Sequence, residues 1–281
     1  MRASELSSSP KPRRVLGEIG MLLVAMIVLF PLYLIMITAV KSPGDIAMSP
    51  FGWPKGFVFN NFVRAWQTGH FDWGFQNSIL ITVISITLIV FIGALAAYPL
   101  ARKPSRLNNL VYILFIALIM VPFQMAMIPL YKLIKGLEWI NTYRAVICIN
   151  IAISMPLVIF LYTGFMKSIP KELEESAIID GCNELMIFWR IVFPLLKPAT
   201  ATVIILNTLQ IWNDFLMPML FLQKAEFRTI PVALFAFQGQ YNNNWSLLFA
   251  AMALAMIPML IMFLILQRDF IKGITAGSVK G

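Results

Sequence analysis

The sequence predicts an all-α polytopic membrane protein with six transmembrane helices. Of its 281 residues, 59% are hydrophobic and 12% are charged, whereas soluble domains carry roughly 25% charged residues. A soluble core of this length does not need so much apolar surface, so a protein that spans the bilayer several times is the first interpretation. Six stretches reach the ~20 apolar residues that a span requires, and they are 20–40, 77–100, 110–130, 145–166, 199–221 and 246–266.

The first apolar stretch could also be a signal peptide, because the basic segment 11–14 precedes it. Its apolar run is too long for the core of a typical signal peptide, and Thr38 to Lys41 is a poor cleavage site, so a retained span is expected. We assign residues 1–76 to an N-terminal cytoplasmic segment, this first helix and an outer loop. Residues 77–268 form a five-helix domain with a long loop at 167–198, and 269–281 form a C-terminal tail.

The distribution of basic residues orients these spans. Loops on the side of the two termini carry 14 Lys and Arg residues, and loops of nearly equal total length on the other side carry eight. Basic residues concentrate in the cytoplasmic loops of membrane proteins, so both termini and loop 167–198 are expected in the cytoplasm. Membrane orientation explains the net charge of +9, and the predicted contact is with the lipid bilayer rather than with nucleic acid.

Loop 167–198 is charged although apolar spans flank it, and it contains five of the 13 acidic residues of the chain. Ser168 and Pro170 suit the start of a helix, acidic residues in the next turn complement its dipole, and Gly181 permits the backbone that ends it. Asn183 can cap a second short helix. The loop could rest on lipid headgroups, but such helices favour Lys and Arg, so an acidic helix indicates a protein partner with a basic groove.

A spaced pattern in this loop resembles the motif of a transporter family. The chain reads Glu175-Ser176-Ala177, three residues, Gly181, nine residues, and then I-V-F-P ending at Pro194. It is similar to the EAA loop of bacterial ABC importer permeases, E-A-A-x-x-x-G, nine residues, I-x-L-P, with Ser176 replacing an alanine and Phe193 replacing the leucine. The resemblance implies a type I ABC importer permease fold. It also implies that loop 167–198 couples the chain to an ATPase through Glu175, Ser176, Ala177, Asp180 and Gly181.

Two further patterns resemble the maltose-type carbohydrate-uptake permeases of this family. The ending GITAGSVKG is similar to their Gly-Leu-Thr-Ala-Gly-x-Val-Lys-Gly, and the trio Trp212-Asn213-Asp214 is typical of them. The resemblance implies a transport subunit that is not an enzyme and that forms half of the path for a sugar or oligosaccharide. It places the chain in a bacterial or archaeal cell membrane, the inner membrane in a Gram-negative cell. The implied ATPase-facing tail residues are Gly273, Thr275, Gly277 and Lys280.

The same resemblance implies a set of partners. They are a sister permease that completes a heterodimer, two ABC ATPase subunits and an extracytoplasmic solute-binding protein. No cofactor is expected on this chain, because ATP and Mg would bind to the ATPase subunits.

Polar residues in the third and fifth spans are candidates for the translocation path. Asn207, Gln210 and Asp214 are spaced to share one side of a continuous helix. Asp214 is the only formal charge in the six spans, and a charge inside the membrane usually faces protein or water. Asn213 adjoins it, and Gln124 lies between two prolines of the third span. The alternative is that these side chains only join helices by hydrogen bonds.

The sequence contains no catalytic, cofactor or metal-binding pattern. The phosphate-binding Gly-x-x-x-x-Gly-Lys-Ser/Thr pattern is absent, so another chain must hydrolyse ATP. His70 is the single histidine, and Cys148 and Cys182 fall in different environments, so neither a metal site nor a disulfide is expected. An ABC permease for a polyamine or an anion stays open as an alternative. An ion-coupled secondary transporter is disfavoured, because such proteins need coupling charges and usually carry internal repeats.

Overall fold

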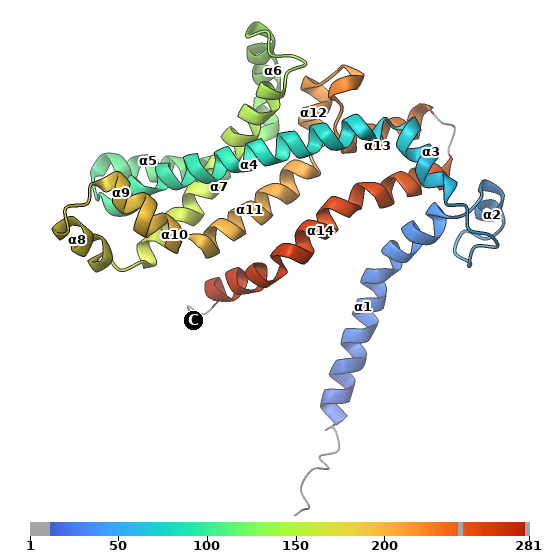
Figure 1. Ribbon diagram of the computed structural model, residues 1–281, viewed down its shortest axis with the longest axis horizontal. Helices are drawn as coiled ribbons and strands as arrows, with labels where there is room; N and C mark the ends of the chain where they lie inside the picture. Colours follow the sequence, from blue (N-terminus) through green and yellow to red (C-terminus); the bar gives the residue numbers. More distant parts are fainter. Residues whose placement is uncertain (1–11, 241–243, 279–281) are drawn as a thin grey trace, which may run out of the picture. The chain divides into compact units, whose positions relative to one another are not determined.

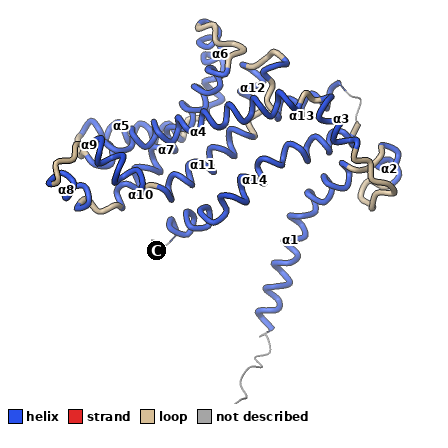
Figure 2. The backbone as a smooth tube through the Cα atoms, in the orientation of Figure 1, coloured by secondary structure: helices blue, strands red, loops and turns tan. Residues whose placement is uncertain are grey.

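The computed structural model of the chain describes residues 12–240 and 244–278, and these ranges contain helices and loops without any strand (Figure 1, Figure 2). The predicted all-α class is confirmed. The chain divides into two compact units, Met1–Thr68 with Phe237–Ala255 and Gly69–Ala236 with Met256–Gly281.

The first unit contains α1 (Pro12–Ala39), α2 (Pro43–Met48) and α3 (Asn60–Thr68). A buried polar cluster fixes the chain where α1 ends. The fully buried Lys41 donates from Nζ to the carbonyl oxygens of Ser49 at 2.8 Å and Pro50 at 3.1 Å. Asn61 Nδ2 donates to the carbonyl oxygens of Ala39 and Lys41, both at 2.9 Å. Hydrogen bonds from the buried Lys41 and Asn61 therefore order the loop after the first span.

The second unit is built on α4 (Phe71–Arg102), which packs along α7 (Tyr143–Ser168). The two helices approach so closely that a Cβ at Gly93 would collide with Val158, and Ile159 and Tyr162 are buried in the same core. A small residue at the crossing is the usual way for membrane helices to pack.

The remaining helices extend this core. They are α5 (Arg106–Ile119), η1 (Phe123–Ala126), α6 (Met127–Gly136), α8 (Glu172–Ile179), α9 (Glu184–Ile187), the π-helix η2 (Phe188–Val192), α10 (Phe193–Leu195), α11 (Lys197–Trp212), α12 (Leu216–Phe221) and η3 (Ala225–Phe227). Helices α13 (Ile230–Gln240) and α14 (Trp245–Ser278) each contribute to both units.

Four helices of the described chain are long and apolar enough to cross a membrane, and they are Leu16–Ala39, Phe71–Arg102, Tyr143–Ser168 and Trp245–Ile265. Two bent pairs, Arg106–Ile119 with Phe123–Gly136 and Glu184–Leu195 with Lys197–Trp212, bring the number to six if each pair is one span.

Two predicted spans are not the continuous helices that the sequence indicated. The third, 110–130, breaks between α5 and η1, and its two parts meet at 94°. Pro122 lies at this break. It has no N–H to donate, and it disfavours a helical backbone at Val121, so the helix ends before it. The fifth, 199–221, ends as a helix at Trp212 and resumes only at Leu216.

The last helix departs from the predicted boundary as well. Helix α14 continues through Ser278, so most of the segment 269–281, which we assigned to a C-terminal tail, is helical. Lys280 lies outside the described residues.

Candidate functional site

The predicted coupling loop lies between α7 and α11 and consists of α8, α9, η2 and α10. Figure 1 shows α8 and α9 at the end of the second unit where α5 begins. An ion pair joins α9 to this end, because Lys103 Nζ lies 2.8 Å from Glu184 Oε2. The loop is thus a compact pair of helical segments, as the sequence predicted.

Local chemistry builds the hinge between α8 and α9. Gly181 has a φ of 81°, its N–H donates to Ile178 O at 3.0 Å, and Cys182 N donates to Ala177 O at 2.9 Å. These two bonds form a Schellman motif, which satisfies the last carbonyl groups of α8. Asn183 then caps α9, because its Oδ1 accepts from Met186 N at 2.8 Å.

The predicted start of α8 is wrong in one detail. Ser168 does not cap it; the Ser168 hydroxyl donates to Phe165 O at 2.7 Å within the last turn of α7. Helix α8 begins at Glu172, and Lys171 occupies the cap position without a side-chain bond. Pro170 has no N–H to donate, and the extended backbone of Ile169 separates α7 from α8.

The acidic residues of α8 divide into a buried and an exposed set. Glu174 is buried, and Arg102 Nε at the end of α4 donates to its Oε1 at 2.6 Å. Tyr98 donates from its hydroxyl to Glu174 Oε2 at 2.9 Å. Arg102 also donates from Nη2 to Ile169 O at 3.1 Å. This Arg102–Glu174 pair fastens α8 to the second span, and charge-assisted bonds of this kind are the strong ones.

Sequence reasoning missed Glu174 because it treated the acids of the loop as one group. A signal was present: Glu174 precedes the buried Ala177 by three residues, so both side chains lie on the inward face of α8. Arg102, the last residue of a span, was a suitable partner.

The other coupling residues point outward. Glu175, Ser176, Asp180 and Gly181 are exposed, and Ser176 donates from Oγ to Glu172 O at 2.8 Å. Apolar side chains share this surface, with 60% of Ile178, 86% of Ile179 and 65% of Leu185 exposed. A surface that combines acids with contiguous exposed apolar side chains is typical of an interaction site.

Aromatic contacts hold the second half of the loop on α4. The Phe91 ring lies 5.7 Å from the rings of Trp189 and Phe193, and Tyr98 lies 5.3 Å from Phe188 in an edge-to-face arrangement. Phe193, which replaces the leucine of the EAA pattern, thereby stacks on the second span. The π-helix at Phe188–Val192 belongs to a type of helical irregularity that is frequent at functional sites.

The candidate path residues do not all lie on one continuous helix, because α11 ends at Trp212. Asn207 is buried and donates from Nδ2 to Val203 O of its own helix at 2.8 Å, whereas Gln210 is exposed. Asn213 donates from Nδ2 to Leu209 O at 2.8 Å. Asp214 lies beyond the end of α11 and caps α12, with Oδ1 accepting from Leu216 N at 3.0 Å and Met217 N at 3.3 Å.

Gln124 is exposed in η1, at the bend between α5 and α6. Gly273, Thr275 and Gly277 belong to the backbone of α14. Within residues 12–240 and 244–278, no group of three His, Cys, Asp or Glu side chains could hold a metal ion. Among the described residues, the loop between α7 and α11 presents four predicted site residues, Glu175, Ser176, Asp180 and Gly181, on one exposed surface.

Comparison with known proteins assigns the chain to a family. A family model described as "Binding-protein-dependent transport system inner membrane component" matches residues 89–275. The chain belongs to this family. It is a multi-pass permease subunit of a binding-protein-dependent ABC transporter in the cell membrane, as the EAA pattern indicated, and this assignment excludes a secondary transporter that acts alone.

Curated relatives cover nearly the whole chain. The melibiose/raffinose/stachyose import permease protein MelC of Bacillus subtilis is 44% identical over 252 residues, which are 89% of this chain and 91% of MelC. The multiple sugar-binding transport system permease protein MsmG of Streptococcus mutans is 36% identical over 90% of this chain and 92% of its own length.

A solved structure shares the fold. It is described as a bacterial ABC transporter involved in the import of the acidic polysaccharide alginate. One of its chains matches with a TM-score of 0.82 at 21% identity and covers 94% of this chain and 99% of its own length. The predicted permease fold is confirmed.

Proposed function

We propose that the chain forms half of the translocation path of a carbohydrate importer and carries a sugar or oligosaccharide. The observation that carries this proposal is the 44% identity, over 89% of the chain, with a permease named for the import of melibiose, raffinose and stachyose. The GITAGSVKG ending supports the same class of solute. Completing the transporter requires a sister permease, two ATPase subunits that bind ATP and Mg, and an extracytoplasmic solute-binding protein.

The loop between α7 and α11 is the element that transmits ATP-driven movement. Glu175 and Asp180 present negative charge to a basic groove of the ATPase, and the exposed Ile179 fills an apolar part of it. Ala177 packs α8 on the core of the permease, and Gly181 sets the angle between α8 and α9. Since the groove lies on a cytoplasmic subunit, this side of the permease and both of its termini face the cytoplasm.

The exposed Ser176 lies on the same helix and completes this docking surface. The end of α14, with Gly273, Thr275 and Gly277, and the following Lys280 reach toward the ATPase pair.

Polar side chains of the third and fifth spans contribute to the translocation path. Asn213 and Asp214 lie where the fifth span is interrupted between α11 and α12, and interrupted helices often mark substrate sites in transporters. Gln210 and Gln124 are exposed amides that can pair with sugar hydroxyl groups, and the buried Asn207 supports the wall behind Gln210.

Uptake in cells tests the solute class. Deletion of the gene should abolish uptake of at least one labelled di- or oligosaccharide, and expression of the intact chain should restore it. Labelled putrescine and sulfate serve as controls, and their uptake should not change. Loss of polyamine or anion uptake with normal sugar uptake would assign the permease to the alternative solutes.

A further inference from the structure

A basic cavity lies where three helices of the second unit meet. It has a volume of about 500 Å³, is open at the surface, and lies between the turn that joins α4 to α5, the end of α7 and the segment before α8. Arg106, Lys167 and Lys171 line it, together with Tyr112 and Asn108. No carboxylate lines this cavity, so it concentrates positive charge without an internal counter-ion.

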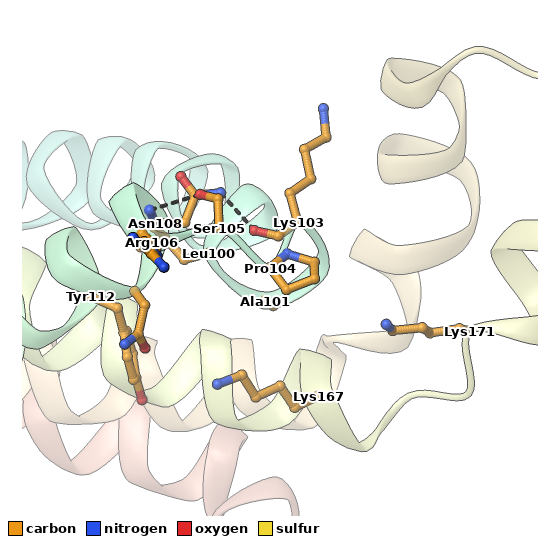
Figure 3. Close-up of a pocket in the computed structure, with 11 residues that line it drawn as sticks. Leu100, Ala101, Lys103, Pro104, Ser105, Arg106, Asn108, Tyr112, Lys167 and Lys171 are labelled. Atoms are coloured by element: carbon orange, nitrogen blue, oxygen red, sulfur yellow. Dashed lines mark hydrogen bonds between the residues drawn. The ribbon is translucent and has the colours of Figure 1, made fainter.

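The arrangement of the cations suits a negatively charged ligand. Figure 3 shows Lys167 extending toward Tyr112, and Lys171 pointing in the same direction from the segment before α8. Lys167 Nζ lies over the Tyr112 ring, 5.0 Å from its centroid. Among the described residues, no carboxylate forms an ion pair with Arg106, Lys167 or Lys171. Lys103, in contrast, points away from the cavity and pairs with Glu184.

The walls of the cavity are ordered before any ligand binds. Asn108 Nδ2 donates to Lys103 O at 2.8 Å and to Pro99 O at 3.3 Å, and the Ser105 hydroxyl accepts from Asn108 N at 3.0 Å. These bonds fix the turn between α4 and α5, which carries Arg106 and forms one wall of the cavity. A preorganised site loses less entropy when a ligand binds.

The position of the cavity indicates which negative group it receives. It lies between the ends of two apolar spans, Phe71–Arg102 and Tyr143–Ser168, at the level where a bilayer places its headgroups. The apolar side chains of Leu100 and Ala101 also line it, which suits a ligand with a charged head and an acyl chain. Basic pockets between membrane helices recognise lipid phosphates in this way.

We propose that this cavity binds the phosphate group of an anionic phospholipid. Arg106, Lys167 and Lys171 supply the positive charge that attracts the phosphate group. Because Lys171 directly precedes α8, the bound lipid steadies the base of the coupling helix. A soluble phosphorylated compound would use the same phosphate chemistry, and the experiment separates these two sources.

The test is native mass spectrometry of the full-length chain in detergent, titrated with phosphatidylglycerol or phosphatidylcholine. The wild type should retain one phosphatidylglycerol more tightly than any phosphatidylcholine. Lys167→Gln with Lys171→Gln should weaken this binding by at least roughly tenfold, since each cation at an anionic surface contributes about a factor of five. Arg106→Gln, from the opposite wall, should weaken it by about fivefold.

The matched control is Lys132→Gln with Lys135→Gln, which removes equal charge from exposed lysines of α6 and should bind as the wild type does.

Three results with the lipids would overturn the proposal, and a fourth with inorganic phosphate would do so as well. The three lipid results are unchanged lipid binding by the Lys167 and Lys171 variant, an equal loss in the Lys132 and Lys135 control, or equal retention of the two lipids by the wild type. Displacement of the lipid by millimolar inorganic phosphate would assign the cavity to a soluble phosphate and would overturn its assignment to a lipid. These readouts do not depend on the transported solute or on ATPase activity.

Discussion

Replacing Glu174 by leucine should release the coupling helix α8 from the second span. The change leaves Arg102 buried without its carboxylate, because the side chains of Arg102 and Glu174 are only 7% and 11% exposed. Removing one partner of a buried pair costs ~3–5 kcal/mol. Arg102 keeps its bond to Ile169 O, so we expect the lower end of this range, about 3 kcal/mol.

Hydrogen exchange of the α8 amides measures this loss directly, because local opening exposes them. At 1.36 kcal/mol for each factor of ten, a loss of about 3 kcal/mol makes exchange roughly 150-fold faster. Amides in the middle of α7 should serve as the internal reference and keep their protection.

The double variant Arg102→Met with Glu174→Leu supplies the decisive control. It removes both charges and fills the site with apolar side chains, an exchange that is often neutral for buried pairs. Protection of α8 should therefore return to within about tenfold of the wild type. Exchange as fast as in Glu174→Leu alone, or no acceleration in the single variant, would refute the claim that the Arg102–Glu174 pair fastens α8.

Three other changes have distinct expected outcomes. Gly181→Val should lower transport because a left-handed backbone costs other residues ~1–2 kcal/mol, whereas Gly136→Ala, at a helical glycine with open space, should not; equal transport by both variants would contradict the hinge. Asp214→Ala should lower the melting temperature by losing a cap worth ~0.5–2 kcal/mol, and Asp214→Asn should lower it less; the reverse order would contradict the capping role. Deletion of Thr275–Gly281 should reduce ATPase stimulation while membrane insertion stays normal, and full stimulation in the truncated chain would contradict a regulatory tail.

Features that depend on local chemistry could be predicted from the sequence. Gly181 and Asn183 end and begin helices through their own backbone and side-chain preferences, so the hinge of the coupling loop was predictable to the residue. The membrane-spanning helices were equally predictable, because their apolar runs are long enough to cross a bilayer. The EAA spacing identified the family because the pattern spans a long segment and the chain departs from it at few positions.

Features that depend on contacts between distant segments could not be predicted in this way. The carboxylate of Glu174 resembles its exposed neighbours in sequence, and only the approach of Arg102 from α4 distinguishes it. Asp214 was interpreted as a charge inside a continuous span, whereas the chain breaks after Trp212 and the carboxylate caps α12. The segment 110–130 was predicted to be one span, but the chain bends by 94° at the break that contains Pro122.

The coupling role of the loop between α7 and α11 is tested most directly by stimulation of the assembled transporter with sugar-loaded binding protein. The variant to measure is Glu175→Lys with Gly181→Val, for which membrane insertion should stay near normal. Its ATPase subunits should be lost on purification or should hydrolyse ATP without responding to the loaded binding protein, and sugar uptake should fall. Asp72→Lys, at an exposed acid in the opposite end of α4, is the control and should behave as the wild type does. Full uptake and normal stimulation in the Glu175 and Gly181 variant would contradict the account.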